Sequence, residues 1–142
     1  CLVGSEMCIR DSIYKKQVEE LEQLGIAHFY GFQSDPRPFY TEADCVVLPS
    51  YHEGMSNVLL EAAATGRPVI TSNIPGCRES VENGKSGLLV EAKNKEMLYQ
   101  AMKKMLHCSR EEREKMGKAG REKMKREFRK EAVVERTVRS LE

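Results

Sequence analysis

Residues 46–71, VVLPSYHEGMSNVLLEAAATGRPVIT, decide the fold that we predict for this 142-residue chain. An apolar strand ends at Pro49-Ser50, a helix is expected from Asn57 to Thr65, and a second apolar strand follows Gly66, which is placed to end the helix. Short apolar strands that alternate with helices are typical of an α/β fold with a parallel sheet covered on both faces. Such sheets bind ligands beyond the carboxyl ends of their strands, and EGMSN, residues 53–57, stands at that position.

The rest of the chain extends this pattern. We expect about four strands, at 27–32, 45–48, 68–71 and 88–90, and helices at 13–24, 57–65, 75–81 and 94–106, with a helical turn opened by Asp35-Pro36. From Ser109 onward the sequence is highly charged, and we interpret it as a solvated helical tail. Its apolar stripe for docking is thin and consists of Phe128, Val133, Val134 and Val138.

The bulk composition argues against several classes of function. Charged residues make up 32% of the chain and the formal net charge is +1, which gives no field that would select nucleic acid. No apolar run approaches the roughly 20 residues that span a bilayer. The five cysteines show no C-x-x-C spacing and the three histidines are scattered, so the spacing indicates no metal site. We interpret the cysteines as reduced thiols of a cytoplasmic protein.

Two glutamates, Glu53 and Glu61, raise the question of why an apolar helix carries a carboxylate. Ser56 is a good N-cap for the helix, whose first N–H groups and positive dipole end form a site suited to phosphate. Gly54 allows a ligand to approach the backbone closely. We expect Glu61 to be buried one turn into the helix, where ribose hydroxyls would satisfy it, and Glu53 to point into the cleft mouth. Diphosphate, ribose and a third group describe a nucleotide-sugar.

The wider sequence resembles the donor-binding domain of retaining glycosyltransferases of the GT-B kind, family 4 type, also called glycosyl transferases group 1. The family pattern is AD-x-x-VLPS-x-x-EG-x-S-N-V-L-L-E-A-x-A-x-G-x-PVI, followed by G-x-x-E-x-V-x-x-G-x-x-G-x-L-V. The chain matches nearly every fixed position from Ala43 to Val90, and Tyr40 also fits. The resemblance covers about residues 13 to 139 and implies the partial Rossmann-like sheet of a GT-B C-terminal domain.

The resemblance also implies roles for individual residues. Glu53 corresponds to the first Glu of the family's E-x7-E motif, which contacts the donor sugar, and we take it as the catalytic candidate. Glu61 corresponds to the second, which binds the ribose hydroxyls. The loop and helix start whose backbone holds the diphosphate correspond to Gly54, Met55, Ser56, Asn57 and Val58. Three further candidates for the cleft are Gly76, Cys77 and Arg78. His52 we interpret as a loop residue.

For the whole protein, the resemblance implies a hexosyltransferase of bacterial capsule, exopolysaccharide or lipid-linked glycan synthesis. Its donor would be a nucleotide-sugar, most often a UDP-sugar, and its acceptor a glycan or an undecaprenyl-diphosphate-linked sugar. No metal or other cofactor is expected, since the helix end and basic residues stabilise the departing diphosphate. The expected location is cytoplasmic, at the inner face of the plasma membrane, with peripheral membrane association and no nucleic-acid partner.

The chain also departs from the family. Residues 2–11, LVGSEMCIRD, resemble a translated sequencing adapter, so we treat 1–12 as an adapter-derived artefact. We assign 13–108 to a partial donor-binding domain and 109–142 to its charged helical tail. The family's acceptor-binding domain and the Arg and Lys that clamp the phosphates have no counterpart here. We therefore expect the 142 residues alone to be inactive in sugar transfer.

The sequence leaves two other functions open. One is a sugar-nucleotide epimerase of the same architecture, which would need its own acids and bases in the cleft. The other is a non-catalytic nucleotide-binding or interaction module, for which Glu53 and Glu61 would both be dispensable. Alanine substitution of each glutamate in the full-length protein separates these classes from a transferase.

Overall fold

The computed structural model describes residues 12–31 and 33–128, which fall into a small unit that ends at Pro36 and a larger unit from Arg37 onward. The small unit contains α1 (Ser12–Gln23), which confirms the predicted helix. The predicted strand at 27–32 is wrong as far as the structure describes it, because residues 27–31 have no strand pairing and residue 32 lies outside the described residues. The Phe29 amide instead donates to the Glu22 carboxylate at 2.6 Å.

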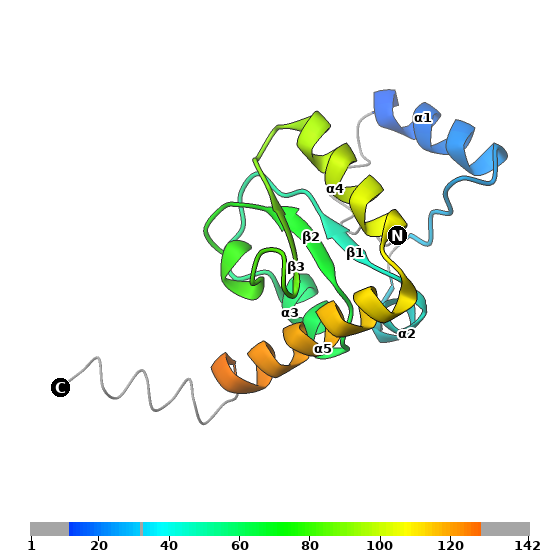
Figure 1. Ribbon diagram of the computed structural model, residues 1–142. Helices are drawn as coiled ribbons and strands as arrows, with labels where there is room; N and C mark the ends of the chain where they lie inside the picture. Colours follow the sequence, from blue (N-terminus) through cyan, green and yellow to red (C-terminus); the bar gives the residue numbers. More distant parts are fainter. Residues whose placement is uncertain (1–11, 32, 129–142) are drawn as a thin grey trace. The chain divides into compact units, whose positions relative to one another are not determined.

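The larger unit is a parallel sheet with helices on both sides (Figure 1). Its elements, in chain order, are α2 (Arg37–Glu42), β1 (Val46–Leu48), α3 (Asn57–Ala64), β2 (Val69–Ser72), the 3-10 helix η2 (Arg78–Ser80), β3 (Gly87–Val90), α4 (Lys95–His107) and α5 (Arg110–Glu127). The strand order is β1-β2-β3, and both pairs are parallel. The described part of the chain therefore has three strands, where four were predicted, and the α/β class is confirmed.

Alternating residues of the strands point to two separate apolar layers. Val46 and Leu48 of β1 face α3, where Leu59 and Ala62 are fully buried. Val47, between them, faces the opposite layer, which α4 closes. The buried members of this second layer are Cys45, Val47, Ile70, Leu88, Val90, Ala101 and Met105. Every residue of β1 is buried and apolar. Such a continuous apolar run is typical of a strand in a parallel sheet.

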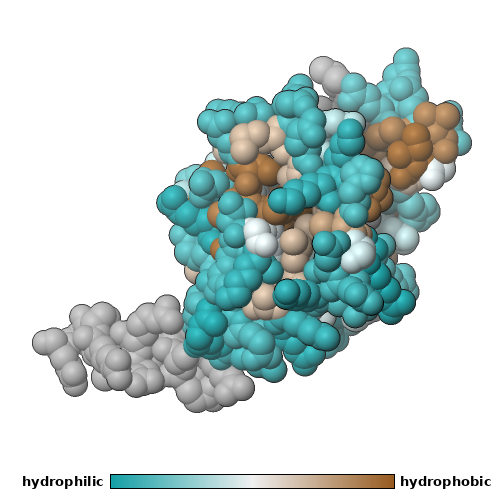
Figure 2. Space-filling model, in the orientation of Figure 1, coloured by the Kyte–Doolittle hydropathy of each residue, from teal (hydrophilic) through white to brown (hydrophobic). Residues whose placement is uncertain are grey.

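The charged tail forms α5, which begins with a capping box and docks closely against α3. The Ser109 hydroxyl accepts from the Glu112 amide at 3.2 Å, and the Glu112 carboxylate accepts from the Ser109 amide at 2.7 Å. Figure 2 shows a largely hydrophilic surface over α5, which agrees with the interpretation of this segment as solvated. Of the predicted apolar stripe, Val133, Val134 and Val138 lie outside the described residues, and Phe128 is half-buried just after α5.

Two glycines of α5 bring its backbone against the end of α3. A Cβ on Gly117 would overlap the carbonyl oxygen of Gly66. A Cβ on Gly120 would lie at an ordinary 3.6 Å from the Cβ atoms of Ala63 and Ser86. Met124, which is 6% exposed, completes the buried contact further along. The docking of α5 therefore depends on direct backbone contact at Gly117 as well as on buried apolar side chains.

This difference predicts opposite effects for two matched substitutions. Gly117→Ala should lower the free energy of unfolding by about 1–3 kcal/mol, because the new methyl group forces α5 away from the Gly66 carbonyl. Gly120→Ala should leave stability unchanged or raise it by about 0.5–1 kcal/mol, since alanine is the better helix former and has room. Chemical denaturation of the two variants beside the wild type measures both. Equal effects of the two substitutions would contradict the docking geometry.

Candidate functional site

The loops that follow β1 and β2 leave the sheet at the same edge. The loop after β1 carries Glu53, and the Ser50 hydroxyl donates to its Oε1 at 2.7 Å. The loop after β2 carries Gly76, whose carbonyl accepts from the Ser56 amide at 3.2 Å. This edge is the carboxyl end of the strands, so Glu53 lies where parallel sheets bind their ligands.

The start of α3 has no side-chain cap. Ser56 occupies the predicted N-cap position and is 4% exposed, but its hydroxyl makes no capping hydrogen bond. The first-turn N–H groups of a helix have no acceptor within the helix, and here no cap takes their place. These donors, together with the positive end of the helix dipole, suit an anionic group.

The surrounding residues leave this helix end open to solvent. Gly54 is exposed, and a Cβ on it would meet nothing within 4 Å. Met55 is 50% exposed, and Asn57 is exposed on the first turn of α3. Val58 is half-buried and packs against the apolar layer under α3. Gly54, Met55 and Asn57 can therefore meet a ligand, whereas Ser56 is buried and the side chain of Val58 packs in the core.

Glu61 is exposed, and the expectation of a buried carboxylate is wrong. The burial on α3 falls on Leu59, Ala62 and Ala63, so Glu61 lies on the solvent side of the helix. Tyr40 of α2 is 1% exposed, and its phenol is close enough to the Glu61 carboxylate for the negative charge to act on it. Burial, reinforced by the nearby negative charge and hydrogen bond of Glu61, raises the pKa of Tyr40 to about 12. Tyr40 was not among the predicted site residues, although its match to the family pattern was a signal.

The three further candidates for the cleft, which follow β2, have different surroundings. Gly76 adjoins the Glu53 loop through its backbone. The thiol of Cys77 is fully buried and does not face the cleft, and burial raises its pKa, which a hydrogen bond with Thr71 partly opposes. The Arg78 side chain is half-exposed and lies 3.5 Å from the Glu79 carboxylate. His52 is exposed in its loop.

Among the described residues, no group of three or more His, Cys, Asp or Glu side chains is placed to hold a metal ion. No described helix is long and apolar enough to cross a membrane. A cavity of about 610 Å³ lies between α4 and the strands β1 and β2, and it contains none of the candidate residues. The candidate site is thus an open surface made by two loops and the start of α3.

A family model described as "Glycosyl transferases group 1" matches residues 3–123. The chain belongs to this family. One relative is the lipopolysaccharide core biosynthesis glycosyltransferase LpsE of Rhizobium meliloti, 30% identical over 89% of this chain and 36% of the relative. Another is the capsular polysaccharide biosynthesis glycosyltransferase CapM of Staphylococcus aureus, 33% identical over 72% of this chain and 27% of the relative. The chain therefore spans roughly a third or less of these relatives.

Solved structures confirm the fold as that of a GT-B C-terminal domain. The C-terminal domain of the group 1 glycosyl transferase LpcC of Francisella tularensis superposes with a TM-score of 0.69 at 24% identity, over 86% of this chain and 66% of that one. Anabaena Alr3699/HepE, solved in complex with UDP, gives 0.76 at 20% identity, over 90% of this chain and 36% of that one. At these identities the likeness concerns the fold alone.

The contact between Tyr40 and Glu61 predicts a specific dependence of stability on pH. The pKa of Tyr40 is raised in the folded state, so its contribution is complete below the unfolded value of 10.0 and is lost as the pH rises toward about 12. Tyr40→Phe should cost about 1 kcal/mol at pH 7, because the interaction of the phenol with Glu61 is lost, and this deficit should shrink between pH 10 and 12. Urea denaturation of both proteins across that range measures it.

A stability difference between Tyr40→Phe and wild type that stays constant from pH 7 to 12 would show that the phenol does not hold its proton in the folded state. The buried thiol of Cys45, whose pKa is also raised to about 12 by burial, contributes equally to both proteins. The comparison therefore isolates Tyr40.

Proposed function

We propose that this chain is the donor-binding half of a retaining glycosyltransferase that transfers a sugar from a nucleotide-sugar, a UDP-sugar in the first instance, to a glycan or lipid-linked acceptor. The observation that carries the proposal is the uncapped amino end of α3, flanked by Glu53 and Glu61, at the carboxyl edge of a parallel sheet in a chain of this family.

The diphosphate of the donor would lie at the start of α3. Its negative oxygens would accept from the backbone N–H groups at Asn57 and Val58, since the Ser56 amide already donates to the Gly76 carbonyl. Gly54 has no side chain to obstruct it. The same donors would stabilise the charge that grows on the diphosphate as the bond to the sugar breaks. We therefore propose that transfer does not depend on a metal ion, which assays with and without EDTA test.

Glu61 would bind the ribose. It stands four residues after Asn57, which is about 6 Å along a helix with a rise of 1.5 Å per residue, and this suits the separation between a diphosphate and its ribose. The Tyr40 phenol would orient the Glu61 carboxylate, whose exposure leaves acceptor positions for a ligand. Two vicinal hydroxyls of a ribose can donate to one carboxylate.

Glu53 would contact the donor sugar. The Ser50 hydroxyl holds Oε1 of Glu53, which fixes the carboxylate and leaves Oε2 available for sugar hydroxyls. Glu53 would thus orient the sugar toward the acceptor. Holding two reactants in the right geometry lowers the barrier of the reaction between them.

The acceptor and the cellular setting belong to the whole protein. We propose that the parent protein acts in bacterial polysaccharide synthesis, on a glycan or undecaprenyl-diphosphate-linked acceptor, as a cytoplasmic enzyme at the inner face of the membrane. The names of relatives that act in lipopolysaccharide core and capsule synthesis support this setting. Because the chain spans only 36% and 27% of these two relatives, we propose that acceptor binding depends on another part of the parent protein, and we expect these 142 residues alone to transfer no sugar.

We also keep the proposed division of the chain. The close docking of α5 on α3 supports placing the described part of 109–142, residues 110–127, in the same domain as α3. For 1–12 we propose an adapter origin, although the family match begins at residue 3. Sequencing the source DNA across this junction decides the matter, and an unbroken genomic match through residue 1 would refute an adapter origin.

The decisive experiment is sugar transfer by the full-length parent protein, with labelled UDP- and GDP-sugars, for wild type and Glu61→Ala. Losing two hydrogen bonds to a charged group should lower kcat/KM for the donor by tenfold to a hundredfold or more. Glu111→Ala is the matched control, since Glu111 is an exposed glutamate in the first turn of α5. Full activity of Glu61→Ala with the true donor would contradict the proposal.

A further inference from the structure

Gly76 lies against the loop that carries Glu53 more closely than any other amino acid could. Its φ is +86°, in the left-handed region that favours glycine. A Cβ built on Gly76 would overlap the carbonyl oxygen of Gly54 and would lie 2.7 Å from the carbonyl oxygen of Glu53. The two backbones are therefore in direct contact, with no side chain between them.

Hydrogen bonds hold Gly76 on both sides of this contact. Its carbonyl accepts from the Ser56 amide at 3.2 Å, which ties it to the residue just before α3. Its amide donates to Oε2 of Glu79 at 2.8 Å, which ties it to the turn of η2. The main chain of Gly76 thus links the Glu79 side chain of η2 to the backbone just before α3.

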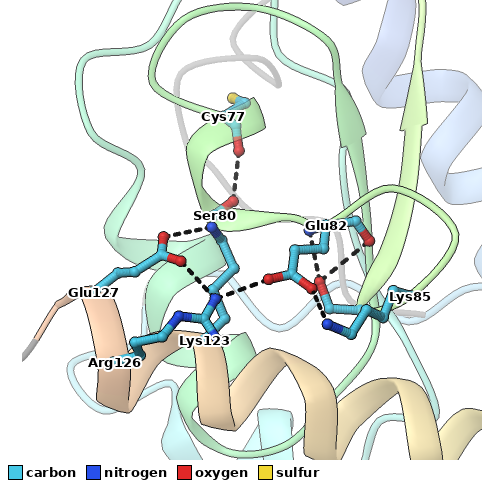
Figure 3. Close-up of polar contacts among 8 residues, drawn as sticks. Cys77, Ser80, Glu82, Lys85, Lys123, Arg126 and Glu127 are labelled. Carbon is cyan, nitrogen blue, oxygen red and sulfur yellow. Dashed lines mark hydrogen bonds and ion pairs between the residues drawn. The ribbon is translucent and has the colours of Figure 1, made fainter.

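The turn behind Gly76 is itself fixed (Figure 3). The Ser80 hydroxyl donates to the Cys77 carbonyl at 2.5 Å, and both residues are fully buried. Just after the turn, the Glu82 carboxylate pairs with Arg126 of α5 at 2.9 Å and with Lys85 at 2.6 Å. A segment anchored in this way can impose a position on the more exposed Glu53 loop.

We infer that Gly76 is a positioning residue, which sets the place of the Glu53-Gly54 backbone relative to the uncapped start of α3. This inference rests on the proposed function, because its consequence is a surface matched to the diphosphate and sugar of the donor. A side chain at position 76 pushes that loop away from the helix end. A shift of about 1 Å in a positioned group can lower a rate about a hundredfold.

The test compares Gly76→Ala with Gly84→Ala in the 142-residue chain. Gly84 also has a positive φ, +77°, but a Cβ there meets nothing within 4 Å. The two variants therefore share the backbone strain, and only Gly76→Ala has the overlap. The measurement is the affinity for UDP and for UDP-glucose, by titration calorimetry on samples whose folded fraction is checked by circular dichroism.

We expect Gly76→Ala to bind UDP-glucose at least tenfold more weakly than wild type, and Gly84→Ala to stay within twofold. Loss of stability alone would lower the fraction of active protein, but it would leave the affinity of the folded fraction unchanged. Equal affinities for the two variants, in a wild type that binds, would overturn the inference and leave the proposed function intact. A wild type that binds neither UDP nor UDP-glucose would overturn both.

A second pair of variants keeps the test decisive if Gly76→Ala does not fold. Glu79→Ala removes the acceptor of the Gly76 amide, whereas Glu79→Gln keeps an acceptor oxygen at the same place. Glu79→Ala should weaken UDP-glucose binding threefold to tenfold, and Glu79→Gln should restore most of it. Unchanged binding by Glu79→Ala would overturn the inference.

Discussion

The parallel pairing of β1 with β2 is the constraint on which the rest of the structure depends. Leu48 pairs with Thr71, and the Thr71 hydroxyl donates to the Leu48 carbonyl at 2.8 Å, so the two strands end within one residue of each other. Because they end close together, the loops that follow them emerge side by side, and Gly76 can contact the backbone of Gly54. An antiparallel or shifted pairing would separate these loops, and the start of α3 would lose its neighbours.

The same arrangement explains why an otherwise apolar helix carries a carboxylate. The core of the domain uses Leu59, Ala62 and Ala63 on one side of α3, which leaves Glu61 on the solvent side, above the hydroxyl of Tyr40. An exposed carboxylate requires no partner to be stable, so the Tyr40 contact orients Glu61 rather than compensating for its burial. Ser56 leaves the first N–H groups of the helix uncapped, which maintains an anion site at moderate cost in helix stability.

Sequence periodicity was sufficient for most elements of the larger unit. The apolar runs around Val47, Ile70 and Leu89 predicted three strands correctly. A strand buried on both faces is a short continuous apolar run, which stands out in the sequence. The segment at 27–32, AHFYGF, is rich in aromatic residues and also predicts a strand, but composition does not show whether a strand has a partner. The docking of α5 through Gly117 depends on a close backbone approach, which a search for apolar stripes does not detect. The exposure of Glu61 could not be predicted either. Its neighbours Leu60 and Ala62 are apolar, so the sequence does not show which side of the helix faces the core.

The most direct test of this account is an amide NMR titration of the 142-residue chain with UDP-glucose. The account predicts that the largest chemical-shift changes fall on the amides of residues 54–58 and on Gly76. It would be contradicted if the largest changes fell in the cavity between α4 and the strands β1 and β2, around Cys45 and Met102. It would also be contradicted if saturating UDP-glucose shifted no amide at all.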